Sequence, residues 1–350
     1  MNSSQSSPAL QGGLLALLAA ILFGISTPLV QYVGRGLGAF STAALLYAGA
    51  ALVAALMRRP SDREAGLRRS DLPRIAAMTG FGAVLGPVAL VWGLQRTSGA
   101  SASLMLTLEA VFTAVLAWRL YGESMDKRVA AAMVLLLMGA ITLVSEQGQA
   151  GTSQLTGLLA VLVATAAWGI DNALSRGVAD RDHGQVVLIK AALGAAATLG
   201  LAILFGESMP TVTAAAALLV IGATGYGLSL RFYLLAQRAF GAGRTGSVFA
   251  FAPFIGALGA FVMGERTGTW LFPVGGLLML LGVLLHLYET HGHAHDHEAL
   301  EHEHAHNHDD GHHLHEHHPM PVSTHSHWHR HEPMRHAHAH VPDAHHLHRH

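Results

Sequence analysis

Two groups of residues in this 350-residue chain have side chains that could bind ions or protons. The first is histidine: all but two of the 26 histidines, His183 and His286, follow Thr290. The second is a small set of ionisable and polar residues inside long apolar runs, of which Glu109 is the deepest carboxyl. The chain has no cysteine, which excludes disulfides, thiolate metal sites and cysteine nucleophiles.

The histidine tail, residues 290–350, contains the same pattern twice. His-x-His-x-His-x-His is followed by a spacer and His-x-His-x-His in both copies. The first copy comprises His291, His293, His295, His297, His302, His304 and His306, and the second His325, His327, His329, His331, His336, His338 and His340. These fourteen histidines are the predicted metal ligands.

Neutral imidazole suits zinc, nickel and cobalt, and a flexible chain can place three or four imidazoles around one ion. We therefore expect the tail to bind a divalent transition metal such as Zn, Ni or Co, without selecting one of them. The alternatives are an expression tag, a polycation that charges on mild acidification, and low-complexity drift. A duplicated segment interspersed with acidic residues is unlike a tag.

Polar residues inside the apolar runs should face a cavity or a partner, because an ionisable group in hydrocarbon costs at least about 2.5 kcal/mol. Glu109 is the best candidate for proton coupling or for contact with a substrate cation. The alternative is a structural carboxylate bonded to a hydroxyl or an arginine of another helix. Arg231 could neutralise Glu109 or hold an anionic group, whereas Lys190 is expected to extend to water at its helix end.

Two polar pairs each follow a glycine, Ser26-Thr27 in one run and Asp171-Asn172 in another. Pro28 adds to the break in the first run, because a proline frees a carbonyl one turn earlier. Interrupted helices at matching places in a chain can frame a binding cavity, so both pairs are predicted to line a cavity. A simple kink is the alternative at Pro28. Trp168 is the aromatic residue expected to contact that cavity.

These residues must be positioned by membrane-spanning helices. The chain is 51% hydrophobic and only 12% charged, too few charges to coat a water-soluble protein of this length. Ten apolar runs are each long enough to cross a hydrocarbon core of about 30 Å. Their approximate bounds are 10–32, 38–57, 74–95, 99–120, 127–145, 156–176, 186–206, 212–236, 243–263 and 270–289. The expected fold is an all-α integral membrane protein, with a tail that is disordered without a ligand.

Lysine and arginine alternate between the loops on the two sides, and short cytoplasmic loops retain them. Thirteen lie on one side: Arg58, Arg59, Arg63, Arg68, Arg69, Arg74, Arg119, Lys127, Arg128, Arg176, Arg181, Arg238 and Arg244. The other side has Arg35, Arg96 and Arg266. Both termini, including the short segment 1–9, are therefore predicted in the cytoplasm. Residues 10–32 look like an uncleaved anchor, and the Ala- and Arg-rich composition points to a bacterial inner (plasma) membrane.

The two halves of the apolar region resemble each other. Aligned pairs are Leu22–Thr27 with Ala167–Asn172, Gln95-Arg96 with Gln237-Arg238, Gly99-Ala100 with Gly241-Ala242, and Gly122-Glu123 with Gly264-Glu265. Residues 10–146 and 156–289 form the two predicted repeats of five helices. Because five is odd, the second repeat enters the membrane in the opposite sense, which makes an inverted-topology pair.

These motifs resemble the drug/metabolite transporter superfamily, specifically its ten-helix type with two EamA domains. The resemblance rests on Phe23-Gly24 and Trp168-Gly169, on the two Gly-Glu pairs, and on Pro253. The first half departs from it, with Val111 in the place that matches Pro253. The resemblance implies alternating access through a central cavity and, most often, export of small metabolites, amino acids or drugs.

The favoured function is therefore a secondary active transporter, a probable exporter of a small metabolite or metal-linked solute, with a metal-binding tail and no enzymatic activity. One alternative is a divalent metal ion transporter fed or regulated by the tail, and another is a membrane-tethered metal store or sensor. No cofactor is required for transport. Expected partners are the lipid bilayer, a small-molecule or metal substrate and, as an open option, a second copy in a homodimer. A net charge of -1 gives no sign of nucleic-acid binding.

Overall fold

The fold of the chain is known from a computed structural model. It describes residues 8–58, 65–121, 125, 127–178, 181–240, 242–266, 269–287, 292–297, 300–306, 325–331 and 334–339. In these parts of the chain, nine helices are long and apolar enough to cross a membrane, and a tenth apolar helix, Leu271–His286, is shorter. The predicted class, an all-α membrane protein with two five-helix repeats, is confirmed.

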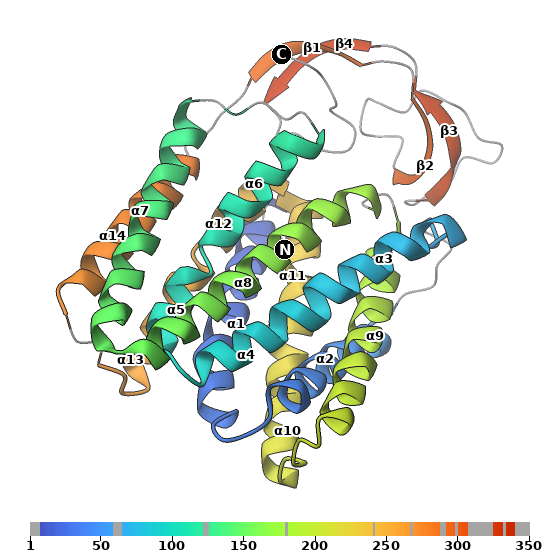
Figure 1. The fold of residues 1–350 in the computed structure, drawn as a ribbon. Coiled ribbons are helices and arrows are strands. Elements are labelled where there is room, and N and C mark those ends of the chain that lie inside the picture. Colours follow the sequence, from blue (N-terminus) through green and yellow to red (C-terminus); the bar gives the residue numbers. More distant parts are fainter. Residues whose placement is uncertain are drawn as a thin grey trace, which may run out of the picture.

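Each repeat consists of five apolar spans, and the helices that form them are labelled in Figure 1. The first repeat comprises α1 Pro8–Val33, α2 Ala39–Leu56, α3 Leu72–Met78 with α4 Gly86–Leu94, α5 Gly99–Met105 with α6 Leu108–Tyr121, and α7 Lys127–Ala150. The second comprises α8 Thr152–Ser175, α9 His183–Leu204, α10 Val212–Ile221 with α11 Ser229–Phe240, α12 Ala242–Phe249 with α13 Ala252–Val262, and α14 Leu271–Leu287.

Helix interruptions occur at equivalent places in the two repeats. Pro87 and Pro253 stand in the first turns of helices that follow interruptions, whereas the break predicted at Pro28 is absent. A π-helical turn, Thr79–Leu85, joins α3 to α4, and its counterpart Gly222–Leu228 joins α10 to α11. The next span is broken between α5 and α6, and its counterpart between α12 and α13. By contrast, α1 continues through Pro28 as one helix. The carbonyl that a proline frees one turn earlier, here that of Gly24, lies against Gly256 of α13.

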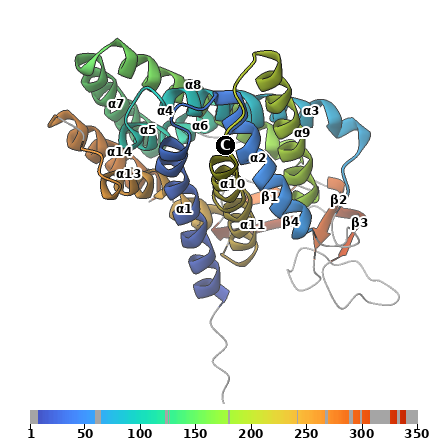
Figure 2. The ribbon, with the colours of Figure 1, turned by 90° about the horizontal axis from the view of Figure 1, so that it is seen from below.

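The two repeats pack as a pseudo-symmetric pair. At one edge α7 packs along α14, and at the other α2 packs along α9 (Figure 2). Between these edges α1 packs on α11 and α13, while its counterpart α8 packs on α4 and α6. The interior holds fully buried Leu46, Leu90, Met105, Leu158 and Leu218. Large apolar side chains are exposed on the outside, among them Ile141, Val212 and Leu258, as expected of a surface that meets lipid.

The glycines of the Phe23-Gly24 and Trp168-Gly169 motifs allow close helix contacts. A Cβ added to Gly24 would lie 3.0 Å from the Cβ of Ile255 and 3.2 Å from the backbone nitrogen of Gly256 in α13. A Cβ on Gly169 would lie 3.2 Å from the backbone nitrogen of Thr113 in α6. The two motifs therefore allow equivalent close contacts in the two repeats. The first span packs on the ninth, and the sixth span packs on the fourth.

Gly24→Ala is expected to destabilise the protein by about 1–3 kcal/mol, because the new methyl group meets backbone that cannot move aside. The measurement is the thermal unfolding midpoint of the detergent-purified protein. Gly200→Ala is the matched control, since a Cβ on Gly200 of α9 has no neighbour within 4 Å among the described residues. Equal midpoints for the two variants would show that the α1–α13 contact has room for a methyl group.

The described parts of the histidine tail form strands, which differs from the expectation of a tail without regular structure. β1 Gly292–His297 pairs antiparallel with β4 Met334–Ala339, and β2 Leu300–His306 pairs antiparallel with β3 His325–His331. The physical reason is the spacing: a residue type that recurs at every second position matches the period of a strand. Figure 1 shows the strands at one end of the helical body.

Candidate functional site in the membrane interior

Glu109 and Asp171, the two carboxyls predicted from sequence, lie close together where the two repeats meet. Glu109 is in the first turn of α6, just after the break that follows α5. Asn172 of α8 donates a hydrogen bond from Nδ2 to Oε1 of Glu109 at 2.7 Å. Glu109 is partly buried and Asn172 is exposed. The carboxyl of one repeat is therefore held by an amide of the other.

Asp171 forms an ion pair with Lys190, which lies on the neighbouring helix α9. The expectation that Lys190 extends to water at its helix end is wrong, because its ammonium donates to Oδ2 of Asp171. Asp171 itself is only 6% exposed. Its second oxygen, Oδ1, has no hydrogen-bond partner in the described part of the chain. A buried acceptor without a partner is costly, so this oxygen is available to a ligand or proton.

The π-helical turn in the third span makes room for Asp171. The Asp171 carboxylate occupies the position that a Cβ on Gly82 would take. The carbonyl of Gly82 accepts two side-chain hydrogen bonds, from Trp168 Nε1 at 2.9 Å and from the Tyr47 hydroxyl at 2.5 Å. A π-helical turn disturbs the regular backbone bonds of a helix. Trp168 is thus bonded to this backbone carbonyl and only 7% exposed.

Ser26 occupies the equivalent place in the other half. It lies against Gly225, the counterpart of Gly82 in the second π-helical turn, and its hydroxyl donates to the Phe23 carbonyl of its own helix at 2.6 Å. Thr27 beside it is 2% exposed. The first half therefore has an uncharged serine where the second has aspartate.

Arg231, the last of the predicted membrane residues, is not part of this cluster. Its Nη1 donates to the carbonyl of Met57, at the end of α2, at 3.2 Å. The prediction that it could neutralise Glu109 is therefore wrong. The cluster that the structure assembles is Glu109, Asn172, Asp171 and Lys190, which we call the interior cluster. With all groups ionised it carries two negative charges and one positive, so a proton or a cation would neutralise it.

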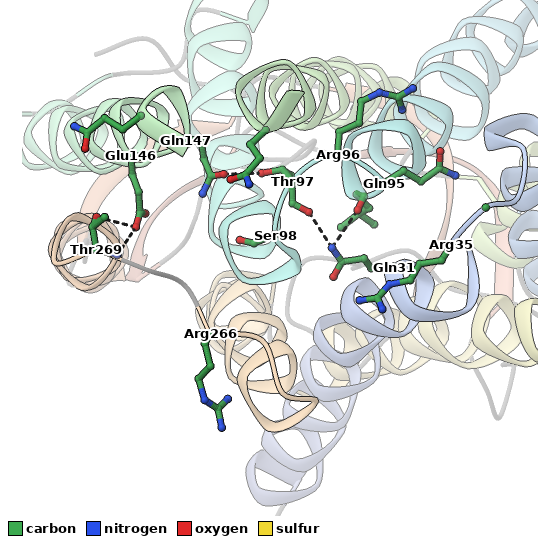
Figure 3. Close-up of a pocket in the computed structure, with 14 residues that line it drawn as sticks. Gln31, Arg35, Gln95, Arg96, Thr97, Ser98, Glu146, Gln147, Arg266 and Thr269 are labelled. Atoms are coloured by element: carbon green, nitrogen blue, oxygen red, sulfur yellow. Dashed lines mark hydrogen bonds between the residues drawn. The ribbon is translucent and has the colours of Figure 1, made fainter. Parts of the chain in front are cut away.

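Polar contacts close the other side of the protein, where Arg35, Arg96 and Arg266 lie. The three arginines line a cavity of about 1130 Å³ together with glutamines of several spans (Figure 3). In the lining of this cavity, Gln31 donates to the carbonyls of Leu94 and Thr97. The reciprocal contact is made by Gln95, which donates to the carbonyls of Gly34 and Leu37. These bonds connect the first span to the third.

Two carboxylates on this side cap helices of the opposite repeat. Glu265 accepts hydrogen bonds from the backbone N–H groups of Gly99 and Ala100 at 2.9 and 3.0 Å. Glu207 accepts from those of Phe40 and Ser41 at 3.1 and 2.7 Å. A carboxylate at a helix N-terminus is stabilised by the helix dipole. The sequence showed the Gly264-Glu265 motif but not its partner, because nothing local identifies a helix of the other half. The related Gly122-Glu123 lies outside the described residues.

Glu265→Ala is expected to loosen the contact between α5 and α13, because two charge-assisted hydrogen bonds are lost, each worth about 1.5–3 kcal/mol. A cysteine placed at Ser103, a fully buried residue of α5 beside Gly256, should then react severalfold faster with a maleimide. The chain has no cysteine of its own, so the label reports on this position alone. Glu265→Gln, which keeps one acceptor oxygen, should give a smaller increase, and an unchanged rate in Glu265→Ala would contradict the role of the cap.

The EamA-like transporter family model matches residues 10–145 and again residues 155–288. The chain belongs to this family. A relative in Methanothermobacter thermautotrophicus, described as an uncharacterized transporter, is 25% identical over 301 residues, which cover 79% of this chain and 86% of the relative. A solved structure titled only as the crystal structure of a protein matches with a TM-score of 0.56 at 18% identity, over 79% of this chain and 95% of that one. That likeness concerns the fold alone.

In this EamA-like transporter the two matched segments are the two repeats that meet at the interior cluster. The family makes the chain a multi-pass membrane transporter. Neither family motif contains a residue of the cluster: Gly24 and Gly169 set helix contacts, and Glu265 caps a helix. The interior cluster of Glu109, Asn172, Asp171 and Lys190 is therefore separate from these motifs.

Proposed function

We propose that this EamA-like transporter is a secondary active transporter that exports a small metabolite or metal-linked solute across the bacterial inner membrane by alternating access. The observation that carries the proposal is the interior cluster. Its charged groups come from both repeats, and Asp171 keeps one buried acceptor oxygen without a partner among the described residues. A charge-bearing site where two inverted repeats meet is where such transporters bind substrate and coupling ion.

Alternating access requires that the two sides open in turn. Polar contacts join the repeats on the side of Arg35, Arg96 and Arg266. At that side α5 packs against α13, whereas α6 packs on α8 and α12 packs on α1 and α11. We propose that these contacts break as the opposite side closes. The distribution of lysine and arginine supports a cytoplasmic location for both termini, so the closed side would face outward.

We also propose that the histidine tail binds divalent zinc, nickel or cobalt, as a buffer or a sensor beside the transport path. The chemistry of clustered imidazoles supports this. Among the described side chains, no group of three or more histidine, aspartate and glutamate residues could hold a metal ion. A metabolite, or a metal bound to one, is therefore ranked ahead of the bare ion as substrate. No resident cofactor is needed for transport, and a homodimer remains an option for assembly.

The test is transport by the full chain in sealed lipid vesicles under an imposed proton or sodium gradient. The candidate solutes are amines, amino acids, metal chelates and free zinc, nickel and cobalt ions. Accumulation of an organic solute or chelate against its own gradient is the expected result. Accumulation of free metal ions alone would replace the proposal with a metal ion carrier, and metal binding by the tail with no transport at all would favour a tethered metal store.

A further inference from the structure

The strands of the histidine tail join its first copy to its second. β1 and β2 belong to the first copy, and β3 and β4 to the second. β1 pairs with β4 and β2 with β3, so each two-stranded ladder takes one strand from each copy. The strands thus pair across the duplication, although β2 follows β1 closely along the chain.

The register places histidine opposite histidine in both ladders. In the β1–β4 ladder His293 is opposite His338, and His295 is opposite His336. In the β2–β3 ladder the opposite pairs are His302 with His329, His304 with His327, and His306 with His325. A slip of one residue would place every one of these histidines opposite a spacer residue. In both ladders the register therefore aligns histidines of the first copy with histidines of the second.

The spacer residues give a reason why the first copy pairs with the second and not with another first copy. Asp296 is opposite Arg335, and Glu301 is opposite Arg330. Opposite charges at facing positions stabilise an antiparallel pair, and like charges destabilise it. In these two facing pairs the acidic residue belongs to the first copy and the arginine to the second, so the pairs are complementary in charge.

We propose that divalent transition metal ions bind between the two copies of the tail, each ion being shared by histidines of both. This rests on the proposed binding of metal by the tail and adds where the ions sit. Facing residues of an antiparallel pair have Cβ atoms about 4.5–5.5 Å apart. Two imidazoles can span that distance with metal–nitrogen bonds of about 2.0–2.1 Å. Metal binding then holds the two copies together, and the conformation of the tail depends on the number of metal ions bound.

The decisive experiment compares two variants that each lose four histidines, two from each copy. The same-ladder variant replaces His293, His295, His336 and His338 by serine and leaves all three histidine pairs of the β2–β3 ladder. The cross-ladder variant replaces His293, His295, His327 and His329 and leaves only the His306–His325 pair. The full chain in detergent is titrated with zinc or nickel alone at neutral pH, against a competing coloured chelator.

The same-ladder variant should keep the tightest site of the unmodified chain, and the cross-ladder variant should bind at least about tenfold more weakly, a loss of about 1.4 kcal/mol. Equal affinity and stoichiometry in the two variants would overturn the shared sites while leaving metal binding by the tail intact. Absence of binding in the unmodified chain would instead remove the proposed metal function of the tail and the shared sites with it.

A second measurement tests the pairing through a disulfide, which the cysteine-free chain makes specific. Ala305 and Ser326 face each other in the β2–β3 ladder, whereas Ala294 belongs to the other ladder. With metal removed by a chelator, so that the new thiolates are not bound to zinc, mild oxidation should form an intramolecular disulfide in Ala305→Cys/Ser326→Cys. Ala294→Cys/Ser326→Cys is the control. Equal yields from the two pairs would contradict the register and with it the shared sites.

Discussion

Lys190→Met is expected to destabilise the protein by about 3–5 kcal/mol, the largest effect on folding of any single change in the interior cluster. The substitution leaves Asp171, which is 6% exposed, without its ion-pair partner. Removing one member of a buried ion pair leaves an uncompensated charge, and that costs far more than the pair contributes as a whole. The measurement is the thermal unfolding midpoint, together with the yield of monodisperse protein in detergent.

The double variant Asp171→Asn/Lys190→Met is the control for Lys190→Met. It removes both charges and keeps side chains of similar size, so most of the lost stability should return. Transport should not return with it if the charged pair takes part in the transport cycle. An unfolding midpoint of Lys190→Met equal to that of the unmodified chain would show that Lys190 is not paired, and that it reaches water at the end of α9.

Glu109→Gln is expected to reduce gradient-driven transport at least tenfold, the equivalent of losing one interaction of about 1.4 kcal/mol. Glutamine keeps an oxygen that can accept the hydrogen bond from Asn172 at the position of Oε1, so the fold should be retained. What disappears is the group that can carry a proton or oppose a cation. The measurement is solute accumulation in vesicles with and without a gradient, where exchange at equal concentrations should be less affected than accumulation.

Glu146→Gln is the matched control for Glu109→Gln. Glu146 is a buried glutamate of α7 that accepts hydrogen bonds from the backbone and hydroxyl of Thr269, away from the interior cluster. Its replacement tests whether the loss of any buried carboxylate, and not of Glu109 in particular, reduces transport. If both variants transport like the unmodified chain, Glu109 is a structural carboxylate, as the alternative interpretation of the sequence held.

The membrane fold could be predicted from the sequence because each span shows its apolar length directly. Expected runs such as 99–120 and 212–236 agree with observed spans within a few residues at each end. The helix interruptions could not be predicted in the same way. Pro28 was the strongest local signal, yet α1 continues through it. Two of the interruptions that occur are π-helical turns rich in glycine, and glycine in an apolar helix equally indicates close packing.

The interior cluster was only partly predictable, because the sequence shows depth along a helix but not direction around it. Glu109 and Asp171 were identified by their depth in apolar runs. Their partners depended on which helices are neighbours. From the sequence, Lys190 was expected to reach water, but α9 packs against the π-helical turn Thr79–Leu85 and Lys190 pairs with Asp171. Arg231 was expected to be a counter-charge for Glu109, but it donates to the carbonyl of Met57.

The tail shows a different limit of sequence reasoning. The duplication and the predicted ligands follow from spacing alone. The pairing between the two copies does not follow from spacing, because it depends on which strands meet. The low apolar content of the tail suggested that it would form no strands. The acidic spacers of the first copy and Arg330 and Arg335 of the second were visible in the sequence. Their complementarity gains meaning only when the register sets them opposite each other.

The unequal halves of the interior bear on how such a protein can evolve after gene duplication. Ser26 stands where the other half has Asp171, which is paired with Lys190. Two identical halves would place two ion pairs in one small apolar space, and two single-repeat ancestors assembled as a dimer could not avoid that arrangement. Fusion into one polypeptide lets each half mutate independently, so one half can carry the ion pair while the other presents uncharged side chains.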